Sequence, residues 1–569
     1  MKCKGARRRR VNGRAVQASF GDVLDVVRAA VDLGAERRGG PLSSRERRLV
    51  AQVRRRTPLG GEAKDALAVE IAAGGDPLGE ALQRLRTRAE LRETGSFYTP
   101  REIVVAMVRW AVSSETTILV DPGCGSGRFA CEAVRQGSTA RIVAIDDDEY
   151  ATLVARANLE VLRPRRAVVV NRDFLKLKAI PGGRGRHARV AFCGNPPYVR
   201  HHYLTLRAKE RGAKLAIEAG HPSYLNAGLH TLFFAKTKLL ANRHDVGCYV
   251  TSAEWLDNTT GKVVRELFLN GLGGTHVMVV DPATFAFAGV KTTAAITRFV
   301  IGGPSESRRL AVNVPLDRIG AFLDGDAGHV TISKSKLENA RGWTDLATNP
   351  DRVEHDGPTI GDLFRVNRGT ATGTNAYFAL KRERARDLGI ERHCVPTVTS
   401  ADEIIAANGV VHDSPALKVV LDLSPTFDRK ADRVVDAYLR SGETAPEGET
   451  PPSQGFNASQ RRKVWYSVAL SRPPIVATYM ARRPPAFAAN PNRLGILNIA
   501  LGLTPKRTLT DEQIALAVNE LNAAGTDLER YAVRYFGNLR KYEPRAVAAL
   551  PLPEGLRHLV EAAEAAAKP

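Results

Sequence analysis

The stretch TILVDPGCGSGRF, residues 117–129, predicts a strand, a glycine-rich turn and the start of a helix in immediate succession. Its apolar beginning is typical of a buried strand. Gly123, Gly125 and Gly127 allow the backbone of the turn to approach a ligand closely. This is the first unit of a doubly wound nucleotide-binding sheet, with a glycine spacing that differs from the dinucleotide fingerprint. The fold class expected is therefore α/β and Rossmann-like.

An acid stands at the end of this expected strand. Asp121 places a carboxylate beside the glycine turn. A carboxylate repels a pyrophosphate and attracts an ammonium group. The ligand favoured by this position is S-adenosylmethionine, ahead of NAD or ATP.

The next two strands also lead to acids. The strand Ala140–Ile145 is followed by Asp146, which can accept hydrogen bonds from both hydroxyls of a ribose. The strand Ala167–Val170 leads to Asp173 and Phe174, placed for an adenine amino group and for the face of its ring. Loops after strands are commonly acidic, so each acid alone is weak evidence. The series of three indicates one nucleoside-containing ligand.

The fourth strand, residues 190–194, delivers a stiff loop, Asn195-Pro196-Pro197-Tyr198. Neither proline has an N–H to donate, and each biases the residue before it toward extended geometry. The loop displays an amide side chain, fixed carbonyls and an aromatic ring at the sheet edge where ligands bind. A proline-stiffened turn is the alternative for an isolated match. The three acids upstream favour a ligand site.

Charge points to the kind of partner. The 569-residue chain has a formal charge of +22 and a pI near 9.9, which favours an anionic polymer, nucleic acid ahead of membrane. About half of the excess lies in residues 1–60, and a solvated basic arm is the alternative interpretation. The sequence has no apolar run of transmembrane length. No apolar run follows the arginines at residues 7–10, so a secretory signal is not expected. Its six cysteines form no C-x-x-C pair and no zinc-like cluster, so a cytoplasmic protein without a metal is expected.

In their order along the chain, these motifs resemble those of the gamma-class DNA adenine-N6 methyltransferases of restriction–modification systems, of the TaqI type. The stretch GSFYTP, residues 95–100, resembles the family's first motif, which helps to hold the methionine end of the cofactor. The resemblance implies S-adenosyl-L-methionine as cofactor and double-stranded DNA as partner. The cofactor-binding residues it implies are Tyr98, Thr99, Pro100, Asp121, Gly123, Gly125, Gly127, Asp146, Asp173, Phe174 and Asn195. Thr99 is also a candidate N-cap of the helix that follows.

The resemblance also implies how the acceptor is treated. The Asn195 side-chain oxygen and the Pro196 carbonyl would accept the two N–H bonds of adenine N6, and Pro197 would keep the loop rigid. Tyr198 would stack on a base that has left the duplex. Phe287, two residues after Phe285, leads a segment that resembles the one whose aromatic residue packs against the flipped base. No titrating base is required before attack.

Three parts are predicted along the chain. Residues 1–92 form a basic helical N-terminal segment, residues 93–305 the catalytic domain, and residues 306–569 a mixed α+β target-recognition and DNA-binding domain. Residues 300–350 are expected to be loop-rich. Within the last part, residues 461–466 (RRKVWY) interleave cations with aromatics, which suits phosphate contact and base stacking or, equally, aromatics in a core with cations outside.

Several other functions are alternatives for this chain. Methyltransferases acting on protein glutamine or on RNA bases use the same Asn-Pro-Pro-Tyr loop or a related one, in shorter proteins without a long basic C-terminal domain. A non-catalytic DNA-binding subunit would not need an intact Asn195 loop, and a fused nuclease would need a motif that residues 1–90 do not show. The sequence leaves two alternatives open for its associate, a cognate restriction endonuclease encoded separately or none, in which case it acts alone in gene regulation. No membrane partner is expected.

Overall fold

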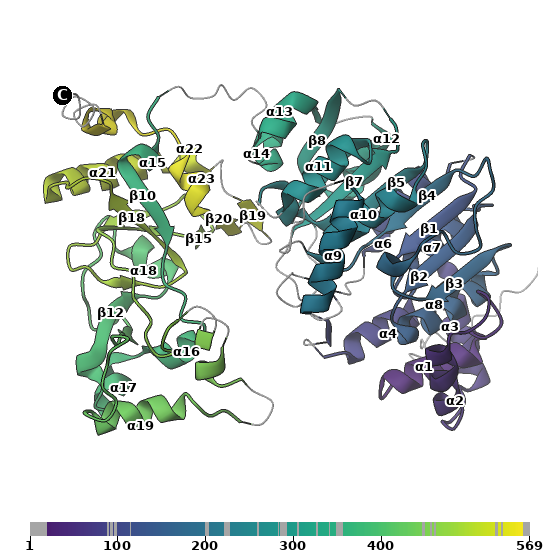
Figure 1. The fold of residues 1–569 in the computed structure, drawn as a ribbon, viewed down its shortest axis with the longest axis horizontal. Coiled ribbons are helices and arrows are strands. Elements are labelled where there is room, and N and C mark those ends of the chain that lie inside the picture. Colours follow the sequence, from purple (N-terminus) through teal and green to yellow (C-terminus); the bar gives the residue numbers. More distant parts are fainter. Residues whose placement is uncertain are drawn as a thin grey trace, which may run out of the picture. The chain divides into compact units, whose positions relative to one another are not determined.

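The structure is a computed structural model, and it divides the chain into two compact units, Met1–Pro350 and Asp351–Pro569. Figure 1 shows the elements of each, and each is described by itself. The structure describes residues 20–87, 90–91, 95, 99–113, 115–199, 204–220, 228–258, 261–282, 284, 293–303, 306–325, 328–340, 342–348, 357–446, 450–455, 458–459, 462–529, 533–535 and 539–560.

The first unit begins with four helices. They are α1 (Val23–Asp32), α2 (Ser44–Val53), α3 (Gly61–Ala73) and α4 (Pro77–Leu85), and they confirm the helical pattern expected for this segment. Ser43 and Glu46 form a reciprocal capping box at the start of α2, which satisfies backbone N–H groups of the first turn. The four helices share one apolar cluster with α8 (Glu149–Leu162). The N-terminal segment therefore packs directly on the sheet domain.

A nine-stranded sheet organises the rest of this unit, in the order β3-β2-β1-β4-β5-β7-β6-β8-β9. Each neighbouring pair in the series β3-β2-β1-β4-β5 is parallel. Strand β7 runs antiparallel to both β5 and β6. Their bounds are β1 Ile118–Pro122, β2 Arg141–Asp146, β3 Ala167–Asn171, β4 Val190–Gly194, β5 Val246–Ser252, β6 Gly274–Val280, β7 Ala294–Val300, β8 Ser307–Val314 and β9 Val330–Ser333. This mixed sheet confirms the predicted α/β, Rossmann-like class.

Helices cover both faces of the sheet (Figure 1). Leu119 of β1 points into the core shared with α6 and α7, and its neighbour Val120 points into the core shared with α10 and α11. Because both faces are buried, the strands read as apolar runs in the sequence. The helices of this region are α6 Arg101–Ala111, α7 Arg128–Arg135, α8, α9 Leu206–Glu218, α10 Leu229–Leu240 and α11 Lys262–Asn270.

The expectation that residues 300–350 are loop-rich is wrong. They hold β8, β9 and the helices α12 (Ile319–Asp324), α13 (Lys334–Asn339) and α14 (Trp343–Thr348). The predicted boundary after residue 305 lies between two strands of one sheet, and the units divide after Pro350 instead. The start of β8 is charged, so the sequence does not show the apolar pattern of a buried strand. Arg308 is nevertheless fully buried and donates to the Leu269 carbonyl at 3.0 Å.

The second unit is mixed α and β, built on three small sheets ordered β10-β18-β14-β16, β11-β13-β12-β17 and β15-β20-β19. The strands are β10 Phe364–Arg368, β11 Ala379–Leu380, β12 Cys394–Val398, β13 Val419–Leu421, β14 Ile475–Thr478, β15 Met480–Ala481, β16 Phe487–Ala489, β17 Gly495–Ile496, β18 Ala500–Pro505, β19 Val533–Tyr535 and β20 Leu539–Lys541. The helices are α15 Ile360–Leu363, α16 Asn375–Phe378, α17 Arg382–Asp387, α18 Ala401–Ala406, α19 Arg433–Ser441, α21 Asp511–Ala523, α22 Gly525–Glu529 and α23 Pro544–Ala548. Across the described parts of both units, the helices are too short or too polar to span a membrane.

Candidate active site

Four of the predicted residues meet at one edge of the large sheet. Asp121 lies near the end of β1, Asp146 ends β2, Asp173 follows β3 by two residues and Asn195 follows β4 directly. These strands are parallel, so their carboxyl ends lie at the same edge. The structure thus brings together residues that are up to 74 positions apart in the sequence.

The glycine turn adopts the backbone that its composition predicts. Gly123, Gly125 and Gly127 have φ values of 70°, 54° and 83°, in the region where a side chain is strained. A Cβ atom on Gly123 would lie 3.3 Å from the Pro197 ring and 3.8 Å from the carbonyl oxygen of Asn195. The first glycine is therefore the point at which this turn passes the Asn-Pro-Pro-Tyr loop.

Asp121 is fully buried beneath the turn. Its Oδ2 accepts a hydrogen bond from the backbone N–H of Ala130 at 3.3 Å, and its buried Oδ1 has no hydrogen-bond partner among the described residues. Burial raises the pKa of Asp121 from 3.8 to about 8, and the nearby Asp146 carboxylate adds to this effect. A buried acceptor without a donor suits a cationic or hydrogen-bond-donating ligand.

Asp146 faces the same turn from β2. Its Oδ2 accepts from the Gly125 N–H at 2.8 Å, and its Oδ1 accepts from the Asp148 N–H at 3.0 Å. Burial, together with the charges of Asp148 and Asp147, raises the pKa of Asp146 to about 7. The carboxylate thus already positions the second glycine of the turn.

Asp173 and Phe174 lie at the end of β3. Asp173 caps the short 3-10 helix η1 (Phe174–Lys176) by accepting from the Leu175 N–H at 2.9 Å. Phe174 is 3% exposed and stacks on Phe233 of α10, with ring centroids 5.1 Å apart. The aromatic pair makes a rigid wall at this corner of the sheet edge.

Hydrogen bonds attach the Asn-Pro-Pro-Tyr loop to the described residues of the first motif. The side-chain amide of Asn195 donates to Thr99 Oγ1 at 3.0 Å, and the backbone N–H of Tyr198 donates to the Gly95 carbonyl at 3.1 Å. Gly95 has φ +63°, and a Cβ there would lie 2.7 Å from the Tyr198 nitrogen. Only a glycine allows the two segments to approach this closely.

The prediction that Thr99 caps the following helix is wrong. The residue before α6 is Pro100, and no side chain caps this helix. The Thr99 hydroxyl is instead engaged by Asn195, a tertiary contact that outcompetes the local one. Tyr98 and Phe287, also assigned from the sequence, lie outside the described residues.

The sequence did not predict the contacts that Asp76 makes with the glycine turn. Asp76 precedes Pro77 and caps α4 by accepting from the Gly79 N–H. The same carboxylate also contacts Ser126 and Arg128 of the glycine turn and α7. The signal in the sequence, an acid before a proline, indicates the cap and not these long-range partners.

The aromatic and basic block in the second unit belongs to its core. Tyr466 is 6% exposed, Trp465 packs against Phe378, and Arg462 donates to the carbonyls of Ala371 and Thr372. For residues 462–466 the structure therefore favours the core interpretation over base stacking. Arg461 lies outside the described residues. Among those that are described, no group of three or more His, Cys, Asp or Glu side chains is arranged to hold a metal ion.

The strand order and the glycine turn define a class I methyltransferase. Residues 77–211 match the family described as N-6 DNA Methylase, and residues 350–568 match that described as Type II methyltransferase M.Eco57I, C-terminal domain. The chain is 35% identical over 487 residues to Type II methyltransferase M.XamI of Xanthomonas campestris pv. amaranthicola, covering 84% of this chain and 87% of that protein.

More distant proteins also match most of this chain. Type II methyltransferase M.AccI of Acinetobacter calcoaceticus is 21% identical over 474 residues, covering 80% of this chain and 84% of that protein. Among solved structures, the Type IIL restriction-modification enzyme MmeI in complex with DNA superposes with a TM-score of 0.55 at 13% identity, covering 93% of this chain and 79% of that one, which bears on the fold alone. This chain belongs to the Type II methyltransferases of restriction–modification systems, in the family of adenine-specific N6 DNA methyltransferases.

Proposed function

We propose that this protein transfers the methyl group of S-adenosyl-L-methionine to N6 of an adenine that has been flipped out of double-stranded DNA. The observation that carries the proposal is the close approach of the glycine turn to the Asn-Pro-Pro-Tyr loop at Gly123. A cofactor held by the turn and a base held by the loop would share one edge of the sheet. Such proximity of two reactants is a main source of rate enhancement.

The residues at this edge fit the cofactor. The buried Oδ1 of Asp121 can accept from the ammonium of the methionine part, and Asp146 can accept from the ribose hydroxyls. Asp173 and Phe174 would contact the adenine, while Thr99 and Pro100 belong to the segment assigned to the methionine end. Bound there, the cofactor would supply an electrophilic methyl group on sulfonium.

The acceptor needs preparation, because the lone pair of adenine N6 is delocalised into the ring. The Asn195 side-chain oxygen and the Pro196 carbonyl would accept the two N6–H bonds and direct the lone pair toward the methyl carbon. The bond from the Asn195 amide nitrogen to Thr99 turns the amide oxygen to the other side, which suits this role. Tyr198 and Phe287 would stack on the flipped base and offset the cost of unstacking, which is a few kcal/mol.

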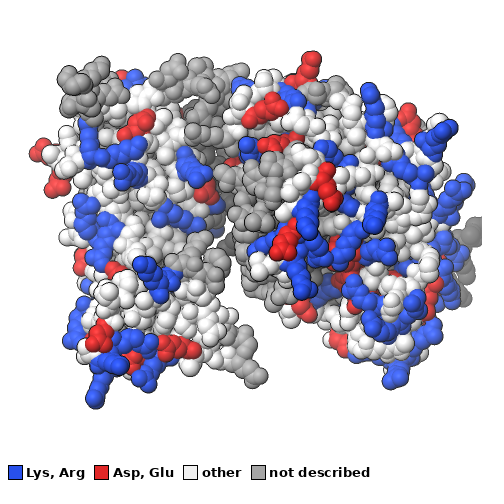
Figure 2. Space-filling model, in the orientation of Figure 1, with Lys and Arg blue, Asp and Glu red and all other residues white. Residues whose placement is uncertain are grey.

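DNA is the expected substrate polymer, and the second unit is the expected target-recognition domain. Lys and Arg side chains spread over the visible face of both units, in keeping with the net charge of +22 (Figure 2). Such charge favours binding to phosphates without specifying sequence. We expect the protein to act in the cytoplasm, either beside a separately encoded restriction endonuclease or as a solitary methylase.

The test offers the purified protein three polymers and one labelled cofactor. We expect label in adenine-containing duplex DNA, recovered as N6-methyladenine. Label found only in protein glutamine or only in RNA would replace the proposal with one of the rival functions. Duplex binding without transfer to any polymer would indicate a non-catalytic DNA-binding subunit.

A further inference from the structure

Asp76, at the start of α4, contacts the glycine turn, α7 and α8 through its two carboxylate oxygens. It is 7% exposed. Its Oδ1 accepts from the Gly79 N–H and from Asn158 Nδ2, both at 3.1 Å. Its Oδ2 accepts from Ser126 Oγ at 2.5 Å and from Arg128 Nε at 2.8 Å. Four donors thus converge on one buried carboxylate.

The partners of Asp76 are themselves parts of the candidate site. Ser126 stands between two glycines of the turn, and its carbonyl accepts from Asn158 Nδ2 at 3.0 Å. Arg128 begins α7 and also donates to the Thr99 carbonyl at 2.9 Å. Thr99 in turn accepts from Asn195. Contacts therefore run from Asp76 through Arg128 and Thr99 to Asn195 of the Asn-Pro-Pro-Tyr loop, which we call the acceptor loop.

We propose that Asp76 is a positioning residue of the cofactor site, which holds the glycine turn and the Thr99 backbone in the geometry that binds S-adenosylmethionine. The inference rests on the proposed function. A turn with three glycines loses much conformational entropy when it is ordered. Interactions that order it before binding reduce that cost at the moment of binding, and so raise affinity. Asp76 makes such interactions.

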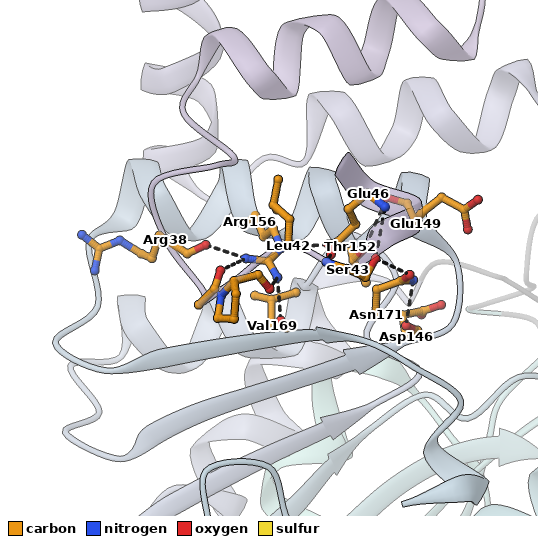
Figure 3. Close-up of polar contacts among 12 residues, drawn as sticks. Arg38, Leu42, Ser43, Glu46, Asp146, Glu149, Thr152, Arg156, Val169 and Asn171 are labelled. Carbon is orange, nitrogen blue, oxygen red and sulfur yellow. Dashed lines mark hydrogen bonds and ion pairs between the residues drawn. The ribbon is translucent and has the colours of Figure 1, made fainter. Parts of the chain in front are cut away.

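A second buried carboxylate of the same segment provides the matched control. Glu46 pairs with Arg156 of α8 at 2.9 Å, and both side chains are fully buried (Figure 3). Arg156 also donates to carbonyls of residues 38, 40 and 41 and to that of Val169. No hydrogen bond of Glu46 reaches the described residues of the glycine turn. Glu46 therefore ties α2 to α8 without a hydrogen bond to the described residues of the turn.

The informative substitution is Asp76→Asn. All four partners are donors, so an amide in either orientation places an NH₂ group against two of them. Asp76→Asn also removes the charge that faces Arg128. Ser126→Ala is milder, because it deletes one of the four bonds and leaves the carboxylate in place. Glu46→Gln removes a buried charge of the same segment that makes no hydrogen bond to the described residues of the turn.

The experiment measures binding of S-adenosylhomocysteine, which needs no turnover, by calorimetry on the full chain. Amide hydrogen exchange of residues 122–130 is measured without ligand. We expect Asp76→Asn to weaken binding about tenfold or more and to speed exchange in this peptide, with a smaller effect of Ser126→Ala in the same direction. Glu46→Gln should lower the melting temperature while its affinity stays within about threefold of the original below that temperature.

Equal affinity in the original protein and in Asp76→Asn would overturn the inference, as would an equal loss of affinity in Glu46→Gln. If Asp76→Asn does not fold, Ser126→Ala decides alone, and undiminished affinity or unchanged exchange in it counts against the inference. An original protein that does not bind S-adenosylhomocysteine would contradict the proposed cofactor instead. The exchange of residues 122–130 would still report whether Asp76 holds the turn.

Discussion

The side-chain amide of Asn195 donates a 3.0 Å hydrogen bond to the hydroxyl of Thr99, so the proposed acceptor loop is oriented by the first motif. An amide can turn over about its own axis, which exchanges its donor and acceptor ends. In the structure the Thr99 hydroxyl accepts from the Asn195 nitrogen, which leaves the amide oxygen on the opposite side. The chemistry assigned to Asn195 therefore depends on a residue that would not touch the base.

Replacing Thr99 with Val should impair turnover more than cofactor binding. The change removes the acceptor for the Asn195 amide while keeping the backbone carbonyl to which Arg128 donates. We expect single-turnover methylation to slow by about 10–100-fold, the range for loss of one orienting hydrogen bond in an active site. Thr237→Val is the control, because its hydroxyl bonds to Tyr249 in the core at 2.7 Å. A normal rate in Thr99→Val would remove Thr99 from this role.

Asn195→Ala and Asp173→Ala should separate the two halves of the site. Without the Asn195 amide we expect methyl transfer to fall at least about a hundredfold while S-adenosylhomocysteine still binds. Asp173→Ala should weaken cofactor binding instead. Calorimetry and a methylation assay on both variants check this division. Undiminished turnover in Asn195→Ala, or an unchanged dissociation constant in Asp173→Ala, would refute the corresponding assignment.

Asp121 should make the stability of the ligand-free protein depend on pH. Burial raises its pKa from 3.8 to about 8, so between these two pH values the folded state keeps a proton that the unfolded state has lost. The stabilisation from this proton is complete below about pH 4 and disappears as the pH rises through 8. Asp121→Asn should therefore be more stable than the original protein at pH 9, with a smaller advantage at pH 5. Urea unfolding at the two pH values measures this, and an advantage independent of pH would contradict it.

The same carboxyl should couple cofactor binding to proton release. A bound ammonium favours the ionised form of Asp121 and lowers its pKa, so affinity should rise with pH between 6 and 8. Asp146, whose pKa is raised to about 7, should contribute in the same direction. Calorimetry of S-adenosylhomocysteine in buffers of different ionisation enthalpy at pH 7 counts the protons released. Proton uptake, or no exchange in the original protein, would be inconsistent with this arrangement.

Gly95→Ala should separate the first motif from the acceptor loop. Its Cβ would meet the Tyr198 nitrogen at 2.7 Å, and the backbone there has φ +63°. We expect a loss of methylation and a lower melting temperature, at a cost of roughly 1–3 kcal/mol in unfolding free energy. Gly60→Ala is the matched control, because Gly60 has open space around it and an ordinary φ of −62°. Equal behaviour of the two variants would contradict the close packing at Gly95.

Local pattern predicted much of the fold, because in this sheet the local signals and the tertiary structure agree. The strand Val190–Gly194 has the predicted bounds. The convergence of Asp121, Asp146 and Asn195 also followed from strand order, since parallel strands end at one edge.

What sequence reasoning missed depends on contacts between distant residues. Asp76 lies 50 residues from Ser126, and the packing of the N-terminal helices on α8 brings them together. Thr99 was predicted to cap the helix because a sequence shows which residues are neighbours along the chain, and not the contact with Asn195. The strand β8 was not predicted because Arg308 is charged, yet this side chain is buried and donates to the carbonyls of Ser307 and Leu269.

The central claim is methylation of adenine N6 at one DNA sequence by the Asn195 loop. Long-read sequencing of DNA from cells that express the chain, compared with cells expressing Asn195→Ala, tests it most directly. We expect N6-methyladenine at a single sequence motif in the first DNA and none at that motif in the second. An unmodified genome, methylation on cytosine instead of adenine, or an equal signal with Asn195→Ala would contradict the claim.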